Sequence, residues 1–477
     1  MKTNTLDFDA QALREKILDL AMRGKLVPQD PNDEPASVLL EKIKTEKEEL
    51  VKEKKIKKSK LLPKITDDEK PFDIPDSWEW VRLGEIGEVF AGGDKPKDFS
   101  DIKDSQHKFP IYSNGIENKG LYGFTSKARV KRPALTLSAR GTIGHVEYRD
   151  TPYLPIIRLI SFVPYDDSYL KCIFYFLQSN QLVEKGDGSS IPQLTVPKLK
   201  PKVIPLPPLS EQSRIAAKIA QLFALLRKVE SSTQQYANLQ TLLKSKVLDL
   251  AMRGKLVEQD PHDEPASVLL KKIKAEKEQL VKEGKIKKSK LLPPVTDEEK
   301  PFDIPDSWEW VRLGDIGAIT SGGTPKTSEK SYWINGTIPW ITPAVMAKCK
   351  DQMIFNSESV KRINNLGLEK SSAHLIPKNS LVVSSRAPIG YVNIVPFEYT
   401  TNQGCKSVSL YKDISEEFIY FALKNSVSDM NNRASGTTFK EISGTKFSQT
   451  IIPLPPLKEQ TKISQKIRVL ATIIHNF

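Results

Sequence analysis

The sequence predicts an α/β protein: two α/β domains separated by a long antiparallel helical coiled coil, in a circularly permuted pseudo-two-fold arrangement. The first observation is a long repeat, because residues 17–84 recur at 247–314 with a constant shift of 230 and 58 of the 68 positions are identical. A second pair of segments, 204–212 and 452–460, recurs with a shift of 248. We call these repeated segments the frame.

Between the copies of the frame lie two stretches, about 78–203 and 308–451, that scarcely resemble each other. We call them the first and second inserts. The second insert is longer by 18 residues, since 248 − 230 = 18. Near-identical frames around unlike inserts indicate one scaffold that carries two different recognition modules.

The two shifts also relate the ends of the chain. Position 477 corresponds to 477 − 248 = 229, and position 1 corresponds to 1 + 230 = 231. The second copy therefore stops where the first would resume, as in a circle cut once. This relation is the basis for the predicted circular permutation.

A 3.5-residue hydrophobic repeat runs through the middle of the chain and is typical of a coiled-coil seam. Its positions are Ile215, Ile219, Leu222, Leu226, Val229, Thr233, Tyr236, Gln240, Leu243, Val247, Leu250 and Gly254. The same phase continues at the two ends, at Ile463, Ile467, Leu470, Ile474 and Phe477 and at Leu6, Ala10, Leu13, Ile17, Leu20 and Gly24. We expect one helix near 208–254, roughly 60 to 70 Å long.

The partner of this helix is expected to be assembled from the last ~20 and first ~25 residues, because a lone helix with one apolar stripe is unstable in water. The two seams would then bury each other. The alternative is a pair of independent amphipathic helices on separate domain cores.

Length and composition set outer limits. With 477 residues and 39% apolar content the chain can form two to four domains. Its three cysteines, Cys172, Cys349 and Cys405, have no paired spacing, and no stretch reaches the ~20 apolar residues that a membrane span needs. These features predict a cytoplasmic protein without disulfides, a zinc motif or a membrane segment.

Most of the formal charge of +13 lies in two lysine-rich arms. Residues 41–60 hold nine Lys against five Glu, and residues 271–290 hold nine Lys against three Glu. We expect each arm to be a helix that opens at Asp-Glu-Pro-Ala and closes before Pro63 or Pro293. The arms either contact nucleic acid or an acidic partner, or are solvated helices with Glu/Lys pairing.

The inserts are rich in Gly, Pro, aromatic and β-branched residues, with short apolar runs such as 135–137 and 381–383. Turn signals such as Asn114-Gly115 and Asn335-Gly336 separate these runs. Each insert is therefore predicted to be an α/β domain with many short strands and long loops.

The motif Ile-Pro-Leu-Pro-Pro-Leu-x-Glu-Gln at 204–212 and 452–460, each time followed by a helix, resembles the specificity subunit of type I restriction-modification enzymes. The inserts are similar to that family at Ser321 to Pro325, Ile338 to Trp340, Ser385 to Gly390, Asn402 to Gly404 and Gly188 to Thr195. The resemblance covers nearly the whole chain.

The resemblance implies a subunit without a catalytic centre, in which two target-recognition domains each bind one half of a bipartite site in double-stranded DNA. It also implies that two methyltransferase subunits, which use S-adenosylmethionine, dock on the frame, and that motor-nuclease subunits complete the restriction enzyme. The corresponding domains are 1–76 (N-terminal helical region), 77–204 (first recognition domain), 205–306 (central helical region), 307–452 (second recognition domain) and 453–477 (C-terminal helix).

Several catalytic motifs are missing from the sequence, including an adenine-methyltransferase motif, a phosphate loop and Gly-x-Gly-x-x-Gly. The segments Pro75 to Glu79 and Pro305 to Glu309 superficially resemble a nuclease centre but lack the Glu-x-Lys that such a centre needs. We expect Trp78 and Trp308 to be anchoring core residues instead.

Candidate DNA-contacting residues follow from side-chain chemistry: Arg bridges guanine, Asn and Gln bridge adenine, and Lys and Ser mostly contact phosphates. In the first insert they are Lys95, Lys97, Ser113, Asn114, Arg140, Ser190 and Gln193. In the second they are Lys326, Arg386, Asn402, Gln403, Thr438 and Lys440. For each of them a role in loop structure is an equal alternative.

Two functions from other classes stay open at this point. One is a self-contained DNA-modifying enzyme, which would transfer methyl groups without other subunits. The other is a protein-only scaffold that joins partners through coiled-coil repeats and does not contact DNA.

Overall fold

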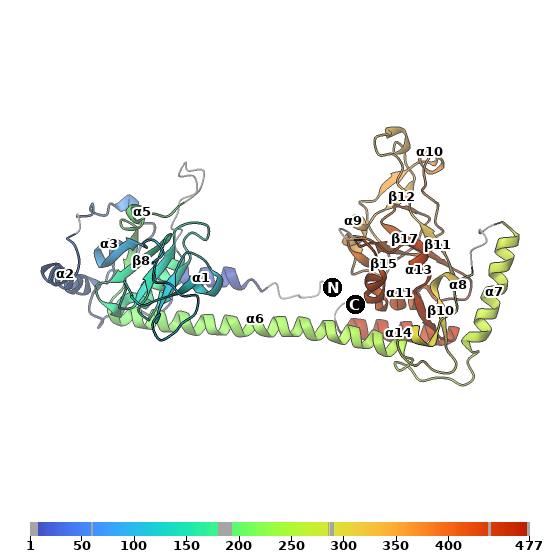
Figure 1. Cartoon of the computed structure of the whole chain (residues 1–477), viewed down its shortest axis with the longest axis horizontal. Coiled ribbons are helices and arrows are strands. Elements are labelled where there is room, and N and C mark those ends of the chain that lie inside the picture. Colours follow the sequence, from blue (N-terminus) through green and yellow to red (C-terminus); the bar gives the residue numbers. More distant parts are fainter. Residues whose placement is uncertain are drawn as a thin grey trace. The chain divides into compact units, whose positions relative to one another are not determined.

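The computed structural model describes residues 8–58, 61–179, 193–284, 286, 291–436 and 440–474 (Figure 1). The chain divides into two compact units between residues 234 and 235. The division falls inside the longest helix, α6 (Leu209–Met252), which has 44 residues. The single helix predicted near 208–254 is therefore confirmed.

The first part of α6 packs against α1 (Ala10–Met22). Leu18 and Ala21 of α1 belong to the same buried cluster as Ile215 and Ile219 of α6. Arg14 of α1 also forms an ion pair with Glu230 of α6. Its Nη1 and Nη2 donate to the two carboxylate oxygens over 3.0 and 2.6 Å.

The last part of α6 packs in the same way against α14 (Leu457–Ile473) (Figure 1). Val247 and Ala251 share a buried cluster with Ile463 and Ile467. The side-chain amide of Gln240 donates to the Ile474 carbonyl over 3.2 Å. Each end of α6 therefore has a short helical partner from one end of the chain.

The middle of the apolar stripe on α6 is open. Val229, Tyr236 and Leu243 have exposed fractions of 44, 57 and 49%. The expectation of a seam buried along its whole length is thus met only at the two ends, among the described residues. The expected junction of Met1 with Phe477 lies outside those residues.

Besides α1 and the start of α6, the described residues of the N-terminal unit form further α-helices and several short strands. The helices are α2 (Ala36–Lys52), α3 (Leu83–Ile86), α4 (Leu170–Ser179) and α5 (Val196–Leu199). The strands are β1 (Glu79–Arg82), β2 (Gly87–Ala91), β3 (Phe109–Tyr112), β4 (Leu121–Thr125), β5 (Ala134–Ser138), β6 (Val146–Arg149), β7 (Leu154–Pro155), β8 (Leu159–Pro164) and β9 (Val203–Leu206).

The C-terminal unit repeats this plan. Its helices besides α14 are α7 (Ala266–Lys282), α8 (Leu313–Ile316), α9 (Pro343–Met346), α10 (Asn365–Glu369), α11 (Glu416–Asn425), α12 (Val427–Arg433) and α13 (Gly444–Ser448). Its strands are β10 (Glu309–Arg312), β11 (Gly317–Ser321), β12 (Ile338–Ile341), β13 (Lys361–Ile363), β14 (Ser380–Ser385), β15 (Ile389–Val395), β16 (Thr400–Thr401), β17 (Cys405–Leu410) and β18 (Ile451–Leu454).

The two inserts share one sheet topology although their sequences differ. A four-stranded sheet has the order β2-β8-β5-β6 in the first insert and β11-β17-β14-β15 in the second. A three-stranded sheet has the order β4-β3-β7 or β13-β12-β16, and a two-stranded ribbon joins β1 to β9 or β10 to β18. The prediction of α/β inserts with many short strands is confirmed.

The strand registers make the inserts equivalent residue by residue. Leu135 of β5 pairs with Phe162 of β8, and Leu381 of β14 pairs with Val408 of β17. A shift of 246 therefore relates β5 to β14 and β8 to β17. Both inserts also place a buried tyrosine opposite a buried serine, since the hydroxyls of Tyr153 and Tyr399 donate to Ser161 and Ser407 over 3.0 Å. The added length of the second insert lies mainly between β12 and β14, at residues 342–379.

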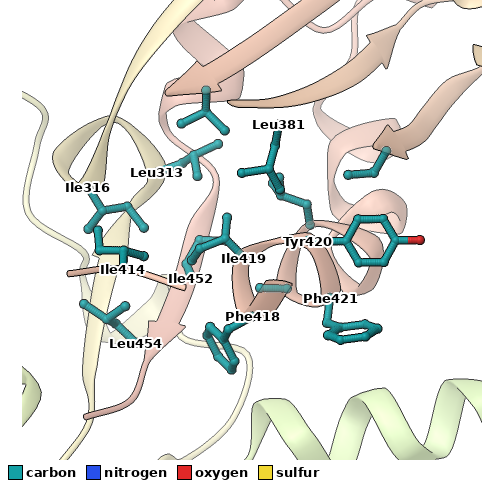
Figure 2. Packing of buried hydrophobic residues seen from close by; sticks show 14 of the residues in the cluster. Leu313, Ile316, Leu381, Ile414, Phe418, Ile419, Tyr420, Phe421, Ile452 and Leu454 are labelled. Atoms are coloured by element: carbon teal, nitrogen blue, oxygen red, sulfur yellow. The ribbon is translucent and has the colours of Figure 1, made fainter. Parts of the chain in front are cut away.

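A helix covers each four-stranded sheet. Ser415 caps α11 by accepting from the Phe418 amide, and Glu416 and Glu417 place negative charge in the first turn. Figure 2 shows Ile419 of α11 between Leu381 of β14 and Ile452 of β18. The frame ribbon and the insert sheet thus share one core, which fixes the insert on the frame.

The lysine-rich arms differ from the prediction at their C-terminal ends. The helices α2 and α7 end at Lys52 and Lys282, well before Pro63 and Pro293. Just beyond the ends, Lys54 and Gly284 have φ of 58° and 70°, a left-handed conformation that terminates a helix. The apolar faces of both helices pack on the domain core, with Leu39 and Ile43 buried in α2.

Candidate nucleic-acid interface

In the second insert, loops from four places in the chain meet at one edge of the four-stranded sheet. The Gly323 amide donates to the Thr401 carbonyl over 2.8 Å, which joins the loop after β11 to the segment before β17. The Ser385 amide donates to the Gly404 carbonyl over 2.7 Å, and the Ile442 amide donates to the Ser385 carbonyl over 3.0 Å. Main-chain bonds therefore hold the four loops together.

Glycine is required where these loops approach most closely. A Cβ atom on Gly322 would lie 1.9 Å from the Asn402 carbonyl oxygen, and one on Gly323 would lie 2.3 Å from the Ser372 carbonyl carbon. Both distances are shorter than any van der Waals contact, so a side chain at either position would separate the loops. This explains the two glycines of the Ser-Gly-Gly-Thr-Pro sequence at 321–325.

Predicted residues of the second insert gather at this edge. Arg386 lies just after β14 and is exposed, and Gly404 is so close to it that an added Cβ would lie 3.2 Å from the arginine Nε. Asn402 accepts from the Gly404 amide over 3.0 Å, and exposed Gln403 accepts from the Thr324 hydroxyl over 2.5 Å. Arg386, Asn402 and Gln403 thus form one cluster.

Two charged residues of this edge were not among the predicted candidates. Lys406 is buried on β17, and its Nζ lies 3.4 Å from Oε1 of Glu441. The other Glu441 oxygen lies 3.8 Å from Nη1 of Arg386. Glu441 lies in the segment between α12 and α13, and it belongs to none of the motifs identified in the sequence.

The first insert makes the same main-chain connections. The Gly93 amide donates to the Pro155 carbonyl over 3.2 Å. The Ala139 amide donates to the Arg158 carbonyl over 3.1 Å, and the Leu194 amide donates to the Ala139 carbonyl over 2.9 Å. At the shift of 246, Arg140 occupies the position of Arg386. Both arginines belong to a Ser-x-Arg-x-x-Ile-Gly-x-Val sequence, at 138–146 and 384–392.

Three predicted residues of the first insert have structural contacts. The Asn114 side-chain amide donates to the Arg140 carbonyl over 2.9 Å, and the Ser113 hydroxyl lies 3.4 Å from the Ile157 carbonyl. Lys95 places its ammonium 3.5 Å from the centre of the Phe99 ring. These contacts support the loop-structuring alternative for Ser113 and Asn114, and they fix Lys95 at the surface by a cation–π interaction.

The other candidates are exposed or fall outside the described residues. Lys97, Gln193, Lys326 and Lys440 are exposed. Ser190 and Thr438 lie outside the described residues, as does most of the Gly188 to Thr195 motif. Arg158, which was not among the candidates, is exposed at the same edge, and its carbonyl accepts from the Ala139 amide.

The frame holds each domain through a buried tryptophan. Trp78 and Trp308 have exposed fractions of 4 and 3%, which confirms them as core residues. Their indole N–H groups donate to Glu211 and Glu459 over 2.8 and 2.9 Å. These are the glutamates of the repeated Pro-Pro-Leu-x-Glu-Gln motif.

Burial affects the charge of both glutamates. Desolvation raises the pKa of Glu211 and of Glu459, and the hydrogen bond from the tryptophan in each case acts in the opposite direction. A second hydrogen bond comes from Gln29 or Gln259, at 2.5 Å in both units. The two copies of the frame therefore have the same polar network, in which the tryptophan and the glutamate are buried and the glutamine is exposed.

The lysine arms keep much of their charge at the surface. Lys54, Lys55, Lys57 and Lys58, beyond the end of α2, are exposed. Lys47 lies inside the helix and is half-buried, and desolvation lowers its pKa. Exposed ion pairs such as Lys42–Glu34, Lys272–Glu264 and Lys55–Glu53 neutralise part of the charge of the arms.

The sequence and fold match known proteins along most of the chain. The family described as type I restriction modification DNA specificity domain matches residues 75–239 and 305–476. The specificity subunit of the type I restriction enzyme EcoAI from Escherichia coli is 34% identical over 545 residues, which cover 96% of this chain and 88% of that protein. The EcoEI specificity subunit from Escherichia coli is 36% identical over 389 residues, which cover 67% of this chain and 64% of that protein.

A solved structure agrees in fold. A chain from work on the complex assembly and conformational transition of the type I R-M system has a TM-score of 0.53 and 20% sequence identity. The match covers 85% of this chain and 92% of that chain. Among the described helices, none combines the length and apolar content needed to cross a membrane.

Proposed function

The chain belongs to the family of type I restriction-modification DNA specificity subunits, and from this premise we propose that each insert binds one half of a bipartite site in double-stranded DNA. The first recognition domain would span residues 77–204 and the second 307–452. The remaining segments, 1–76, 205–306 and 453–477, would form the helical frame.

The observation that carries this proposal is the shared loop edge. The same three main-chain hydrogen bonds hold that edge in both inserts, whereas the side chains that it displays differ. A rigid sheet that presents variable loops is the usual arrangement for recognition. Arg140 and Arg386, at equivalent positions, are the residues most suited to contact guanine.

The repeated frame supports two equivalent docking surfaces for one kind of protein. The buried Trp78–Glu211 and Trp308–Glu459 pairs give the two copies of the frame the same internal packing. Residues 17–84 and 247–314, identical at 58 of 68 positions, give them nearly the same surface. Identical surfaces bind identical partners. We propose that these partners are two methyltransferase subunits, which supply S-adenosylmethionine and the catalytic groups, and that motor-nuclease subunits join them on host DNA in the cytoplasm.

The circular, pseudo-two-fold frame is part of the same proposal. Its support is that Leu18 of α1 shares a buried cluster with Ile215 in the first part of α6, and Val247 in the last part of α6 shares one with Ile463 of α14. A variant with residue 477 linked to residue 1 and new ends between residues 229 and 230 should bind DNA as tightly as the natural chain. Loss of binding in that permuted chain would contradict the circular arrangement.

Mapping of methyladenine in a host genome, with and without this chain, tests the function. We expect a single bipartite motif that disappears when the chain is deleted. Purified chain with S-adenosylmethionine and DNA should transfer no methyl groups; transfer without partners would indicate a self-contained enzyme.

A binding experiment tests the remaining alternative, a scaffold that does not contact DNA. The assembled complex should bind mixed-sequence DNA with an affinity that falls steeply as salt rises, because phosphate contacts release counterions. Absence of binding at low salt would favour the protein-only scaffold.

A further inference from the structure

The second insert carries a buried positive charge directly beneath its loop edge. Lys406 has an exposed fraction of 5%. Its Nζ donates to the Gln403 carbonyl over 2.9 Å, to the Ser385 hydroxyl over 3.3 Å and to Oε1 of Glu441 over 3.4 Å. Glu441 is the one anion among these three partners, and a buried ammonium is stable only when such a charge compensates it.

Glu441 is also fixed to the strand that carries Arg386. The two residues form an antiparallel β-bridge, and the neighbouring Ile442 amide donates to the Ser385 carbonyl over 3.0 Å. Oε2 of Glu441 lies 3.8 Å from Nη1 of Arg386. One carboxylate therefore joins a buried lysine to an exposed arginine, with a separate oxygen for each.

We propose that Glu441, anchored by Lys406, is a positioning residue that orients the Arg386 guanidinium toward a guanine in the second half-site. This inference rests on the proposed function. Glu441 stays with Lys406 when DNA binds, because leaving a buried charge unpaired costs more than one base contact contributes. Arg386 is exposed, and the Glu441 carboxylate approaches its Nη1 at 3.8 Å without covering the side chain, so the guanidinium is accessible to the O6 and N7 atoms of guanine.

The first insert has the equivalent arginine without this charge pair. Leu137 pairs with Ile160 as Val383 pairs with Lys406, so Ile160 takes the place of the lysine. Gln193, just before Leu194, takes the place of Glu441, just before Ile442. Neither Ile160 nor Gln193 supplies a charge to Arg140. The charge pair thus distinguishes the second recognition domain from the first.

The test uses the complete methyltransferase complex and maps methyladenine motifs on a plasmid library in which every base of the site is varied. The E441Q variant removes the carboxylate, and the K406I/E441Q variant installs the residues of the first insert, so that no buried lysine is left unpaired. R386Q removes the arginine, and E398Q, at an exposed position of the same domain, is the matched control for loss of one negative charge.

At one position of the second half-site, we expect K406I/E441Q to reduce the preference for guanine over the other bases by about 10-fold. This is the loss typical of one base contact. R386Q should reduce the base preference at the same position. The base preference in the first half-site should stay unchanged in both variants, and E398Q should methylate the unaltered motif. If K406I/E441Q keeps the full motif, or weakens methylation equally at all positions, Glu441 is not a positioning residue.

Failure of the proposed function gives a different result. In that case the unmodified complex would methylate no bipartite motif at all. E441Q, which leaves Lys406 unpaired, should also lower the melting temperature more than K406I/E441Q does. Equal melting temperatures for the two variants would show that Lys406 does not depend on Glu441.

Discussion

The two copies of the frame agree in most side chains, whereas the two inserts share their strand order and register but few of their side chains. Trp78 and Trp308 donate to Glu211 and Glu459 over nearly the same distance, and Gln29 and Gln259 complete the same network. The inserts share strand order and register but place Ile160 and Lys406 at the same position. Main-chain pairing and a buried apolar pattern therefore preserve the architecture while the loop edge changes.

The largest effect is expected from loss of a frame tryptophan. W78A and W308A each remove a buried aromatic side chain, which costs about 3 to 5 kcal/mol, and leave Glu211 or Glu459 with one hydrogen bond fewer. Hydrogen exchange followed by mass spectrometry should show the same loss of protection in the unit that carries the substitution. Unequal losses in the two units would mean that the frames are not energetically equivalent.

A smaller effect is expected from the buried tyrosine–serine pairs of the inserts. Y153F and Y399F each remove a hydroxyl that donates to a serine over 3.0 Å, and each should cost about 1 to 3 kcal/mol because the buried serine loses its partner. Chemical denaturation of the two variants measures these costs. If only one of the two variants loses free energy of unfolding, the shared strand register does not make the two tyrosine–serine pairs equally stabilising.

The two copies of the frame differ in the ion pair that each makes with the aspartate at 33 or 263. Arg214 binds Asp33 through two hydrogen bonds of 2.6 and 3.1 Å, whereas Lys462 approaches Asp263 through a single one of 3.2 Å. We expect R214A to destabilise its unit by up to about 1 kcal/mol and K462A by less, since the arginine contact is bidentate. Thermal denaturation measures the fall in melting temperature for R214A, K462A and the control R214K. A larger fall for K462A than for R214A would contradict the expected order.

The smallest effect concerns pH. The hydrogen bond from Arg82 lowers the pKa of Glu69 from its usual 4.5 to about 2. A depressed folded-state pKa stabilises the protein above pH 4.5, and that contribution is lost as pH falls toward 2. The difference in melting temperature between the natural chain and E69Q should therefore shrink over this range; a constant difference would exclude the Arg82–Glu69 pair as its source.

Periodic and repeated features of the sequence predicted the architecture well. The 3.5-residue repeat predicted α6, and the repeated Trp and Glu motifs predicted a shared frame. The helices α2 and α7 end well before the prolines at which the sequence predicts their limit. At the end of α2 the left-handed residue is Lys54, whose type gives no stop signal, whereas at the end of α7 it is Gly284, a residue typical of helix ends. Burial along the middle of the α6 stripe could not be read from periodicity, which says nothing about what covers an apolar face.

The loop edge was only partly predictable. Arg386, Asn402 and Gln403 were found because their residue types suit base contacts, and they do lie together. Lys406 and Glu441 were missed because their importance depends on burial and on a contact across 35 residues. Asn114 was selected for its chemistry, yet its side chain holds the Arg140 carbonyl. Residue type alone does not separate a contact to DNA from a contact within a loop.

The central claim is that one frame carries two independent recognition domains. Replacing residues 308–451 with the insert of another specificity subunit and mapping methyladenine in the host genome tests it most directly. We expect one half of the bipartite motif to change while the other half stays the same. A change in both halves, or in neither, would contradict the claim.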